Sequence, residues 1–368
     1  MHKSFVLFLI LILSVTGLFA QTNPEIQAIE KNYKYHALYD FIEIMQKSKL
    51  SYSINAGNES EFAYTQFVLP IQEGQHIPSI YDRRVTNADG SVKVIEDLPK
   101  GDISRLFDEA AQYIEKEDWG TARKLVERAT QIDPNYFVAW SYLAQTFLFN
   151  DNPLQAIGYL KKAISLNPIA YHEHYLLAMA LYQLGDFENA LESITQAFIY
   201  NRYDPKVIEG LQAVLKAKNM KLYENHMIFP FHIKKVSDTK CDIYLIGEHG
   251  ESWTAMAVST AVWMMEPEFK EIDEKYSKAG IFNSIKFYEI FYGQFGEIAL
   301  RLNNKETVTP LEKRFFNIVN DGYLLQVISW DLLGQAFPEV IYLMKDEEMQ
   351  KLKKYVQKYV FVQQEKSE

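Results

Sequence analysis

Two prolines, Pro134 and Pro168, end two stretches of matching sequence, and this repetition constrains the fold of the chain more than any other feature. The residues that precede each proline by twelve, eight and five positions match: Ala122, Val126 and Ala129 in the first copy, and Ala156, Leu160 and Ala163 in the second. A third copy has Ala190, Ile194 and Ala197 at the same intervals, and its proline, Pro205, comes three positions late. Self-similarity at a period of about 34 residues is typical of small units that stack on one another.

Further matches lie earlier in each copy: Trp140, Leu143, Ala144 and Phe147 in the second, His174, Leu177, Ala178 and Leu181 in the third, and only Ala110 and Tyr113 in the first. The whole pattern resembles the tetratricopeptide repeat, in which each period forms a pair of helices. The resemblance covers about residues 103–204 and implies a short helical solenoid of three repeats. Small residues at Ala122, Ala156 and Ala190 would let the paired helices approach closely, and the proline would end the second helix.

Members of this family usually bind a partner in a concave groove lined by the first helix of each repeat. The register places ten side chains of this chain there: Phe107, Ile114, Val138, Gln145, Leu148, Phe149, His172, Tyr175, Met179 and Tyr182. The resemblance therefore implies a protein or peptide partner. No Lys or Arg lies between Tyr171 and Ala190, so an acidic tail would find no counter-charge there, and we expect an apolar segment instead. Two occupants remain open, a segment of another protein and a segment of this same chain.

The first twenty residues have the features of a signal peptide. Lys3 precedes an apolar run from Phe5 to Leu13, which is too short to cross a bilayer. We expect cleavage after Ala20, with Gly17 as the alternative site and an uncleaved membrane anchor as the alternative interpretation of the segment. The mature protein would then lie in the periplasm or outside the cell, with no membrane span.

Composition narrows the function classes further. The formal net charge is −10 and no dense run of Lys or Arg occurs, which argues against a nucleic-acid partner. Cys241 is the only cysteine, so no intramolecular disulfide forms. In the strand-like stretch 241–246, Cys241, Ile243 and Leu245 alternate with Asp242 and Tyr244. Cys241 therefore lies on the apolar side of a predicted strand, and we expect a buried structural thiol.

The mature chain divides into three segments by pattern. Residues 21–100 begin with a helix and continue with an extended region, in which Phe62–Leu69 is strand-like and 85–86 with 92–95 predict a hairpin. Residues 101–219 hold the three repeats and a capping helix that begins at Asp204-Pro205. Residues 220–368 predict a helical domain of no recognised family. The fold class is mostly α, with minor β structure in 59–97 and 241–246.

Four helices are predicted in the C-terminal segment. Residues 253–265 are apolar nearly all round and predict a buried helix. A second runs over 282–295 and is closed by Gly293 and Gly296, and a third covers 324–337 around Trp330. The last, 346–362, carries a basic face that is either solvated or binds an anionic surface.

No catalytic, cofactor-binding or metal-ligating set is predicted. His172 and His174 point about 200° apart on a helix, so they cannot share a metal ion. The polar loop with Glu248, His249 and Glu251 precedes a helix that we expect to begin at Trp253, with Ser252 as its N-cap. The sequence favours a non-enzymatic protein that mediates protein–protein interaction in the cell envelope. The alternative is a hydrolase or ligand-binding C-terminal domain for which the repeats recruit substrate.

Overall fold

The computed structural model describes residues 24–58, 78–88, 92–223, 229–247, 250–278, 283–333 and 339–364. Helices predominate and the strands are few and short, which confirms the predicted mostly α fold. None of the helices in these ranges is long and apolar enough to cross a membrane.

The chain forms two compact units. The first contains the described residues within 1–67 and 225–328, and the second contains those within 68–224 and 329–368. The sequence pattern groups residues 21–100 into one segment and residues 220–368 into another, and the structure divides each of these segments between the two units.

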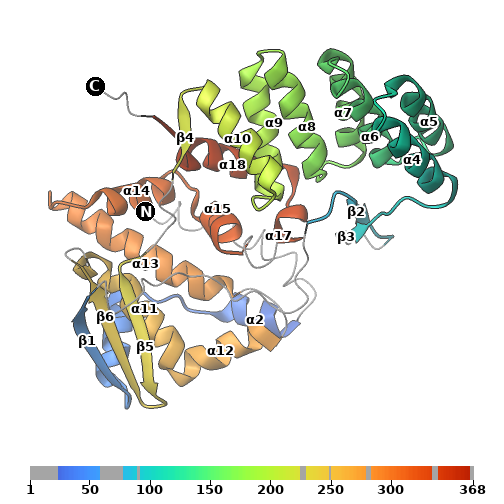
Figure 1. Cartoon of the computed structure of the whole chain (residues 1–368). Coiled ribbons are helices and arrows are strands. Elements are labelled where there is room, and N and C mark those ends of the chain that lie inside the picture. The colour runs from blue at the N-terminus through green and yellow to red at the C-terminus, as the bar shows by residue number, and fades with distance from the viewer. Residues whose placement is uncertain are drawn as a thin grey trace. The chain divides into compact units, whose positions relative to one another are not determined.

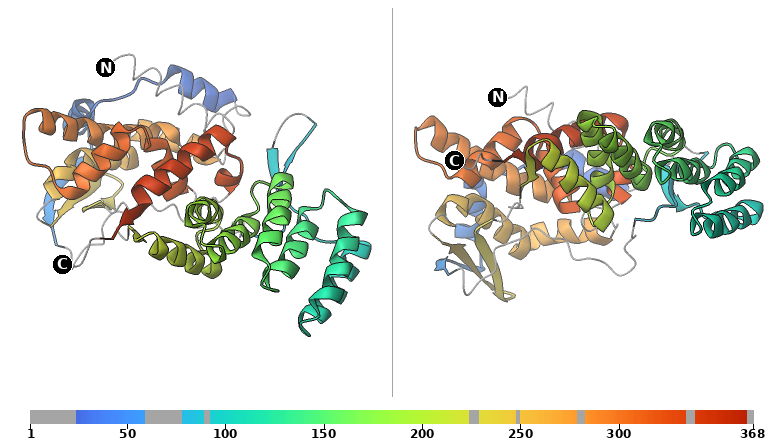
Figure 2. Two further views of the ribbon diagram at one scale, coloured as in Figure 1. Left: turned by 90° about the horizontal axis from the view of Figure 1, so that it is seen from above. Right: turned by 45° about the horizontal axis from the view of Figure 1, so that its top comes forward.

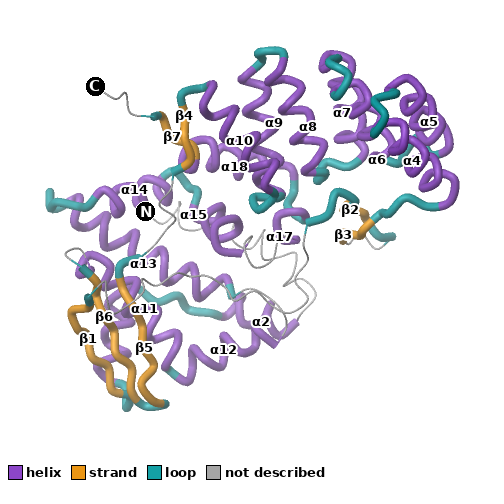
Figure 3. The backbone as a smooth tube through the Cα atoms, viewed as in Figure 1, coloured by secondary structure: helices purple, strands orange, loops and turns teal. Residues whose placement is uncertain are grey.

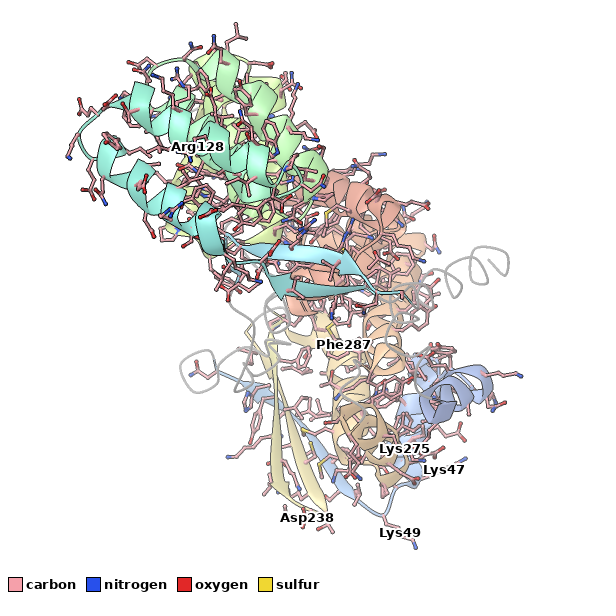
Figure 4. The ribbon with its side chains drawn as sticks, turned by 90° about the vertical axis from the view of Figure 1, so that its right-hand side faces the viewer. Lys47, Lys49, Arg128, Asp238, Lys275 and Phe287 are labelled. Atoms are coloured by element: carbon pink, nitrogen blue, oxygen red, sulfur yellow. The ribbon has the colours of Figure 1, made fainter. Side chains whose placement is uncertain are left out.

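The first unit combines a three-stranded sheet with helices from both ends of the sequence. Its elements are α2 (Pro24–Asn32), α3 (Leu38–Lys47), β1 (Ser51–Gly57), β5 (Phe231–Ser237), β6 (Lys240–Ile246), α11 (Thr254–Met265), α12 (Pro267–Lys278), α13 (Ser284–Asn303), α14 (Pro310–Asn320) and α15 (Leu324–Gln326). Strand β6 is central, with β1 parallel on one side and β5 antiparallel on the other (Figure 1). Asp238 marks the turn between β5 and β6 in Figure 4. Cys241 and Ile243 are fully buried, which confirms the predicted strand and the structural thiol.

Helix α11 is buried almost throughout, as predicted, but it begins at Thr254 and its N-cap is Trp253. The expectation that Ser252 caps it is therefore wrong, because residues 250–253 form a 3-10 turn. The buried amide of Gln294 takes the capping role instead. Its Oε1 accepts from the Met256 backbone N–H (3.1 Å), and its Nε2 donates to the Ser252 carbonyl (2.7 Å).

Helix α13 continues through Gly293 and Gly296, so the prediction that these glycines close a helix is wrong. A Cβ at either position would meet open space, and the burial of the opposite face maintains the helix.

A buried carboxylate on α13 ties the N-terminal residues into the first unit. Glu289 accepts hydrogen bonds from Trp263 Nε1 (2.9 Å), from the Tyr33 hydroxyl (3.0 Å) and from His36 through its backbone N–H (2.7 Å) and Nδ1 (3.0 Å). The hydrogen bond to Glu289 raises the pKa of His36 above its ordinary value. Four donors satisfy a carboxylate that would otherwise be costly to bury.

The second unit contains seven helices in succession (Figure 2). They are α4 (Gly101–Ile114), α5 (Trp119–Ile132), α6 (Phe137–Leu148), α7 (Pro153–Leu166), α8 (Tyr171–Gln183), α9 (Phe187–Tyr200) and α10 (Pro205–Ala217). The second helices of the pairs begin at Trp119, Pro153 and Phe187, and these positions are evenly spaced by one period of the repeat. Ala122, Ala156 and Ala190 are fully buried, as close packing of the paired helices requires.

The turns between paired helices repeat with the same period. The backbone takes a positive φ at Glu117 (57°), Asp151 (51°), Gly185 (76°) and Asn219 (55°), each one period after the last. The fourth position follows α10, so the predicted capping helix is the first helix of an incomplete fourth repeat. It begins as expected, with Asp204 accepting from the Lys206 and Val207 backbone amides.

The connections define two edges of the solenoid. We call the turns within pairs, 115–118, 149–152 and 184–186, the turn edge, and the loops between pairs, 133–136, 167–170 and 201–204, the loop edge. Figure 3 shows both sets of connections as teal segments at opposite ends of α6 to α9.

Two further segments belong to the second unit. Strands β2 (Asp82–Thr86) and β3 (Val92–Glu96) pair antiparallel, which confirms the predicted hairpin, whereas Phe62–Leu69 lies outside the described residues. The C-terminal part contains residues 329–333 of a π-helical stretch (Val327–Leu333) that begins in the first unit. It continues with α17 (Glu339–Tyr342), α18 (Asp346–Tyr355), a second π-helical stretch (Val356–Val360) and β7 (Phe361–Gln363), which pairs with β4 (Met220–Leu222). The predicted helix over 346–362 is therefore shorter, since β4 draws its last residues into a strand pair.

Candidate functional site

The ten predicted groove residues differ widely in exposure. Phe107, Val138 and Leu148 are buried, whereas Phe149 is 56% exposed. The remaining six are half-buried: Ile114, Gln145, His172, Tyr175, Met179 and Tyr182. All ten lie on the first helices α4, α6 and α8 or at the C-cap of α6, but only part of the set is accessible.

Two of these side chains on α8 pack against the next helix. A Cβ placed on Gly210 of α10 would lie 3.0 Å from Met179 Cε and 3.0 Å from Tyr175 Cε2. Glycine at this position therefore allows α10 to approach Tyr175 and Met179 closely. Both residues support the incomplete fourth repeat as well as lining the predicted groove.

The same packing relation occurs at the first repeat. The ring of Phe107 on α4 stacks on Tyr142 of α6, with centroids 4.4 Å apart and planes 4° from parallel. Position 142 in the second repeat is equivalent to position 210 in the fourth. Phe107 thus joins two repeats, and burial of its ring stabilises the stack.

Two other predicted residues point to the turn edge. Phe149 lies beside Trp119 of α5, with ring centroids 6.2 Å apart. Tyr182 lies 5.4 Å from Phe187 at the start of α9. The accessible aromatic surface of the repeats therefore extends from the first helices onto their turns.

Glu173 and the two histidines beside it contribute to the fold of the repeats. Glu173 is fully buried, and burial raises the pKa of its carboxyl to about 7. One of its oxygens, Oε2, has no hydrogen-bond partner among the described residues. Burial lowers the pKa values of His172 and His174 to about 4, and His174 Nε2 lies 2.9 Å from the Pro168 carbonyl. No group of three or more potential metal ligands occurs in the described part of the chain.

The chain itself covers much of the loop edge. Asn167 Nδ2 donates to the Asp82 carbonyl (2.7 Å), and Asn167 Oδ1 accepts from the Arg84 backbone N–H (3.4 Å). The Tyr136 hydroxyl donates to the Asp97 carbonyl (2.9 Å). The hairpin is therefore fixed along two successive loops. These contacts lie at the loop edge, and the occupant of the groove along the first helices stays open.

The C-terminal part covers α9 in a similar way. The guanidinium of Arg202 lies 3.7 Å from the centre of the Trp330 ring and donates to the Trp330 carbonyl. Trp330 Nε1 donates to the Ile199 carbonyl (3.3 Å). Glu192 accepts from Lys353 Nζ (2.6 Å), so one member of the predicted basic face pairs with the solenoid. This covering explains why the last seven residues of α9 are all buried.

The alternative site in the first unit is only partly described. Glu248 and His249 lie outside the described residues, and Glu251 is exposed within the 3-10 turn. A ligand-binding or hydrolytic role there stays a hypothesis.

Of the exposed apolar residues at the turn edge, the sequence predicted Phe149 and missed Leu154 and Leu184. Leu154 is 71% exposed and Leu184 is 48% exposed, each next to a turn. The period of the repeats could have identified them, because it places Leu154 and Leu184 at turns between paired helices, where side chains remain accessible.

Comparison with known proteins identifies the repeat. A family model described as the tetratricopeptide repeat matches residues 174–201, which run from α8 through α9. Similar solved structures include the first such domain of Spaghetti (RPAP3) bound to an HSP90 peptide, with 14% identity, 32% of this chain and 93% of that chain covered, and a TM-score of 0.31. The TPR2B domain of yeast Sti1 in complex with Hsp70 has 22% identity, coverage of 32% and 96%, and a TM-score of 0.30. MamA has 15% identity, coverage of 57% and 98%, and a TM-score of 0.30.

Proposed function

We propose that this tetratricopeptide-repeat protein is exported and binds a segment of another protein in the cell envelope, without catalysing a reaction. Its repeats support a role in protein–protein interaction. Export is inferred from the basic start and apolar run of residues 1–20, and cleavage after Ala20 would release a periplasmic or extracellular protein.

The observation that carries this proposal is the partly exposed face of α6 and α8. Gln145, His172 and Tyr182 are half-buried, so each offers surface to a partner while being held by the fold. Rigid aromatic side chains lose little conformational entropy on binding and are common anchors of interfaces. The pKa of His172 is lowered by burial to about 4, which keeps its ring uncharged at neutral pH.

The charge of this face indicates the kind of segment bound. Helix α8 contains no Lys or Arg, so it presents no counter-charge to a carboxylate. An apolar or aromatic segment, extended or helical, fits better than an acidic tail.

Photo-crosslinking tests the proposal. A photoreactive amino acid would replace Gln145 or Tyr182 on the first helices and, as the matched control, exposed Lys161 on α7. In cells of the native host we expect one partner protein to crosslink from positions 145 and 182 and not from 161. Equal crosslinking from all three positions, or none from the first two, would reject the groove as a binding site.

Export is tested separately. Fractionation should recover the protein outside the cytoplasm, and N-terminal sequencing should begin at Gln21. Recovery in the cytoplasm with Met1 or His2 as the first residue would reject the proposed location.

A further inference from the structure

Large apolar side chains gather along the turn edge. Leu154, Phe149 and Leu184 are 71%, 56% and 48% exposed. Tyr113 and Phe187 are exposed as well, so all three turns contribute. Exposed apolar residues scattered singly need no explanation, but a row at successive turns of one edge indicates an interaction surface.

The fold holds these side chains in fixed positions. The positive φ at Glu117, Asp151 and Gly185 gives the three turns the same course, and the helices that follow begin one period apart. The contact between Phe149 and Trp119 joins the first turn to the second. The three turns therefore follow the same course, and the exposed apolar side chains stand at different positions along them, with Phe149 and Leu154 at the second turn and Leu184 at the third.

Carboxylates surround the apolar row. Six acidic residues lie in or next to the turns: Glu115, Glu117, Asp118, Asp151, Asp186 and Glu188. Three lysines lie near them: Lys218 pairs with Glu188, Lys116 lies over the Tyr113 ring, and Lys124 lies near Asp118. The edge therefore combines exposed apolar anchors with an excess of negative charge.

We propose that the turn edge is a second docking surface, which adjoins the face of the first helices at Phe149, and that it binds a cationic amphipathic helix of a partner protein. The apolar face of such a helix would contact Phe149, Leu154 and Leu184, and its lysines or arginines would lie near the turn carboxylates.

The same charges disfavour the other occupants. A second copy of this chain would bring the same acidic turns together, and like charges at an interface cost affinity. An anionic membrane surface would be repelled for the same reason.

A pair of synthetic peptides tests the proposal on the mature protein. One is a short amphipathic helix of leucine and lysine, and its twin has glutamate in place of every lysine. The leucine–lysine helix should bind, measured by fluorescence anisotropy, and bind more weakly as salt is added, whereas the twin should not bind. Equal binding of both peptides, or binding of neither, overturns the proposal.

Variants then locate the bound peptide. Leu154→Gln combined with Leu184→Gln should weaken binding at least about tenfold, because both anchors become polar. Lys161→Gln on α7 and Gln145→Ala on the first-helix face should leave the affinity unchanged. Loss of binding in Gln145→Ala alone would place the peptide on the first helices, which overturns this proposal and leaves the proposed function standing.

Folding and self-association serve as checks on the double variant. Circular dichroism should show an unchanged melting temperature, which is expected for exposed positions. If sedimentation shows that the double substitution converts a dimer into a monomer, the edge joins two copies of the chain and the proposal is overturned.

Discussion

The two edges of the same solenoid differ in how far other segments of the chain cover them. At the loop edge, Asn167 and Tyr136 hold the β2–β3 hairpin by hydrogen bonds, and Trp330 covers the end of α9. At the turn edge, Leu154 and Phe149 remain more than half exposed. A solenoid has an unsatisfied surface wherever its stacking ends. The chain uses its own segments to cover part of the loop edge, where Tyr203 is still 60% exposed, and we propose that the turn edge is left for association.

The largest effect is expected where the C-terminal part covers α9. Trp330→Ala should lower the free energy of unfolding by about 3–5 kcal/mol, because it removes a buried ring and the cation–π contact that this ring makes with the Arg202 guanidinium. Urea denaturation of the protein measures the change. Phe149→Ala at the turn edge is the matched control and should cost far less. Similar losses in the two variants would remove the distinction between covered and exposed surface.

A pH effect of about 3 kcal/mol is expected from Glu173 between the second and third repeats. Burial raises the pKa of this carboxyl to about 7, whereas its ordinary value is 4.5, so the unfolded chain releases the proton first. The contribution of Glu173 to stability is therefore highest below about pH 4.5 and falls as the pH rises to about 7.

Glu173→Gln isolates this effect from the other carboxyls. The variant should gain stability relative to the parent protein as the pH rises from about 4.5 to 7.5, and the difference should then level off. A difference that does not change with pH would mean that Glu173 ionises normally in the folded protein.

A smaller effect is expected from the hairpin on the loop edge. Asn167→Ala should cost about 1–3 kcal/mol, because the buried Asp82 loses the partner of its carbonyl. Limited proteolysis should then cleave more readily within 78–100. The exposed Asn150 at the turn edge offers the comparison, since Asn150→Ala should change neither quantity beyond about 0.5 kcal/mol.

The smallest effect is expected at the turn edge itself. Leu154→Gln and Leu184→Gln should each change the free energy of unfolding by no more than about 0.5 kcal/mol, since neither side chain is buried. Thermal denaturation is the measurement. A loss above about 1 kcal/mol would show that these leucines pack within the fold, and the edge would no longer count as available surface.

The sequence predicts the repeats well because their information is local. Buried alanines, the Asp204-Pro205 start and the left-handed Gly185 all act within a few residues or within one period. The pairing of β1 with β6 leaves no comparable signal, since Tyr52 and Cys241 meet only through the tertiary fold. Likewise, nothing near Ser252 reveals that Gln294 caps α11 from another helix.

The candidate site was predictable in position but only partly in exposure. The period places Phe107 and Tyr175 on the first helices, where the structure has them. It does not show that Tyr142 and Gly210 of the following helices pack against them. Exposure depends on the neighbouring repeat, and the composition of one helix does not contain that information. The prediction covers only the first helix of each repeat, so it includes Phe149 at the end of α6 and omits Leu154 and Leu184.

Hydrogen–deuterium exchange with and without the leucine–lysine helix tests the contrast between the two edges most directly. In the free protein, amides at 167–170 should exchange slowly because the hairpin covers them, and amides at 149–152 and 184–186 should exchange faster. Adding the peptide should slow exchange at the turn edge and leave the loop edge unchanged. Protection that appears at 133–136 or 167–170 instead would contradict the account, since it would place the available surface on the edge that the chain already covers.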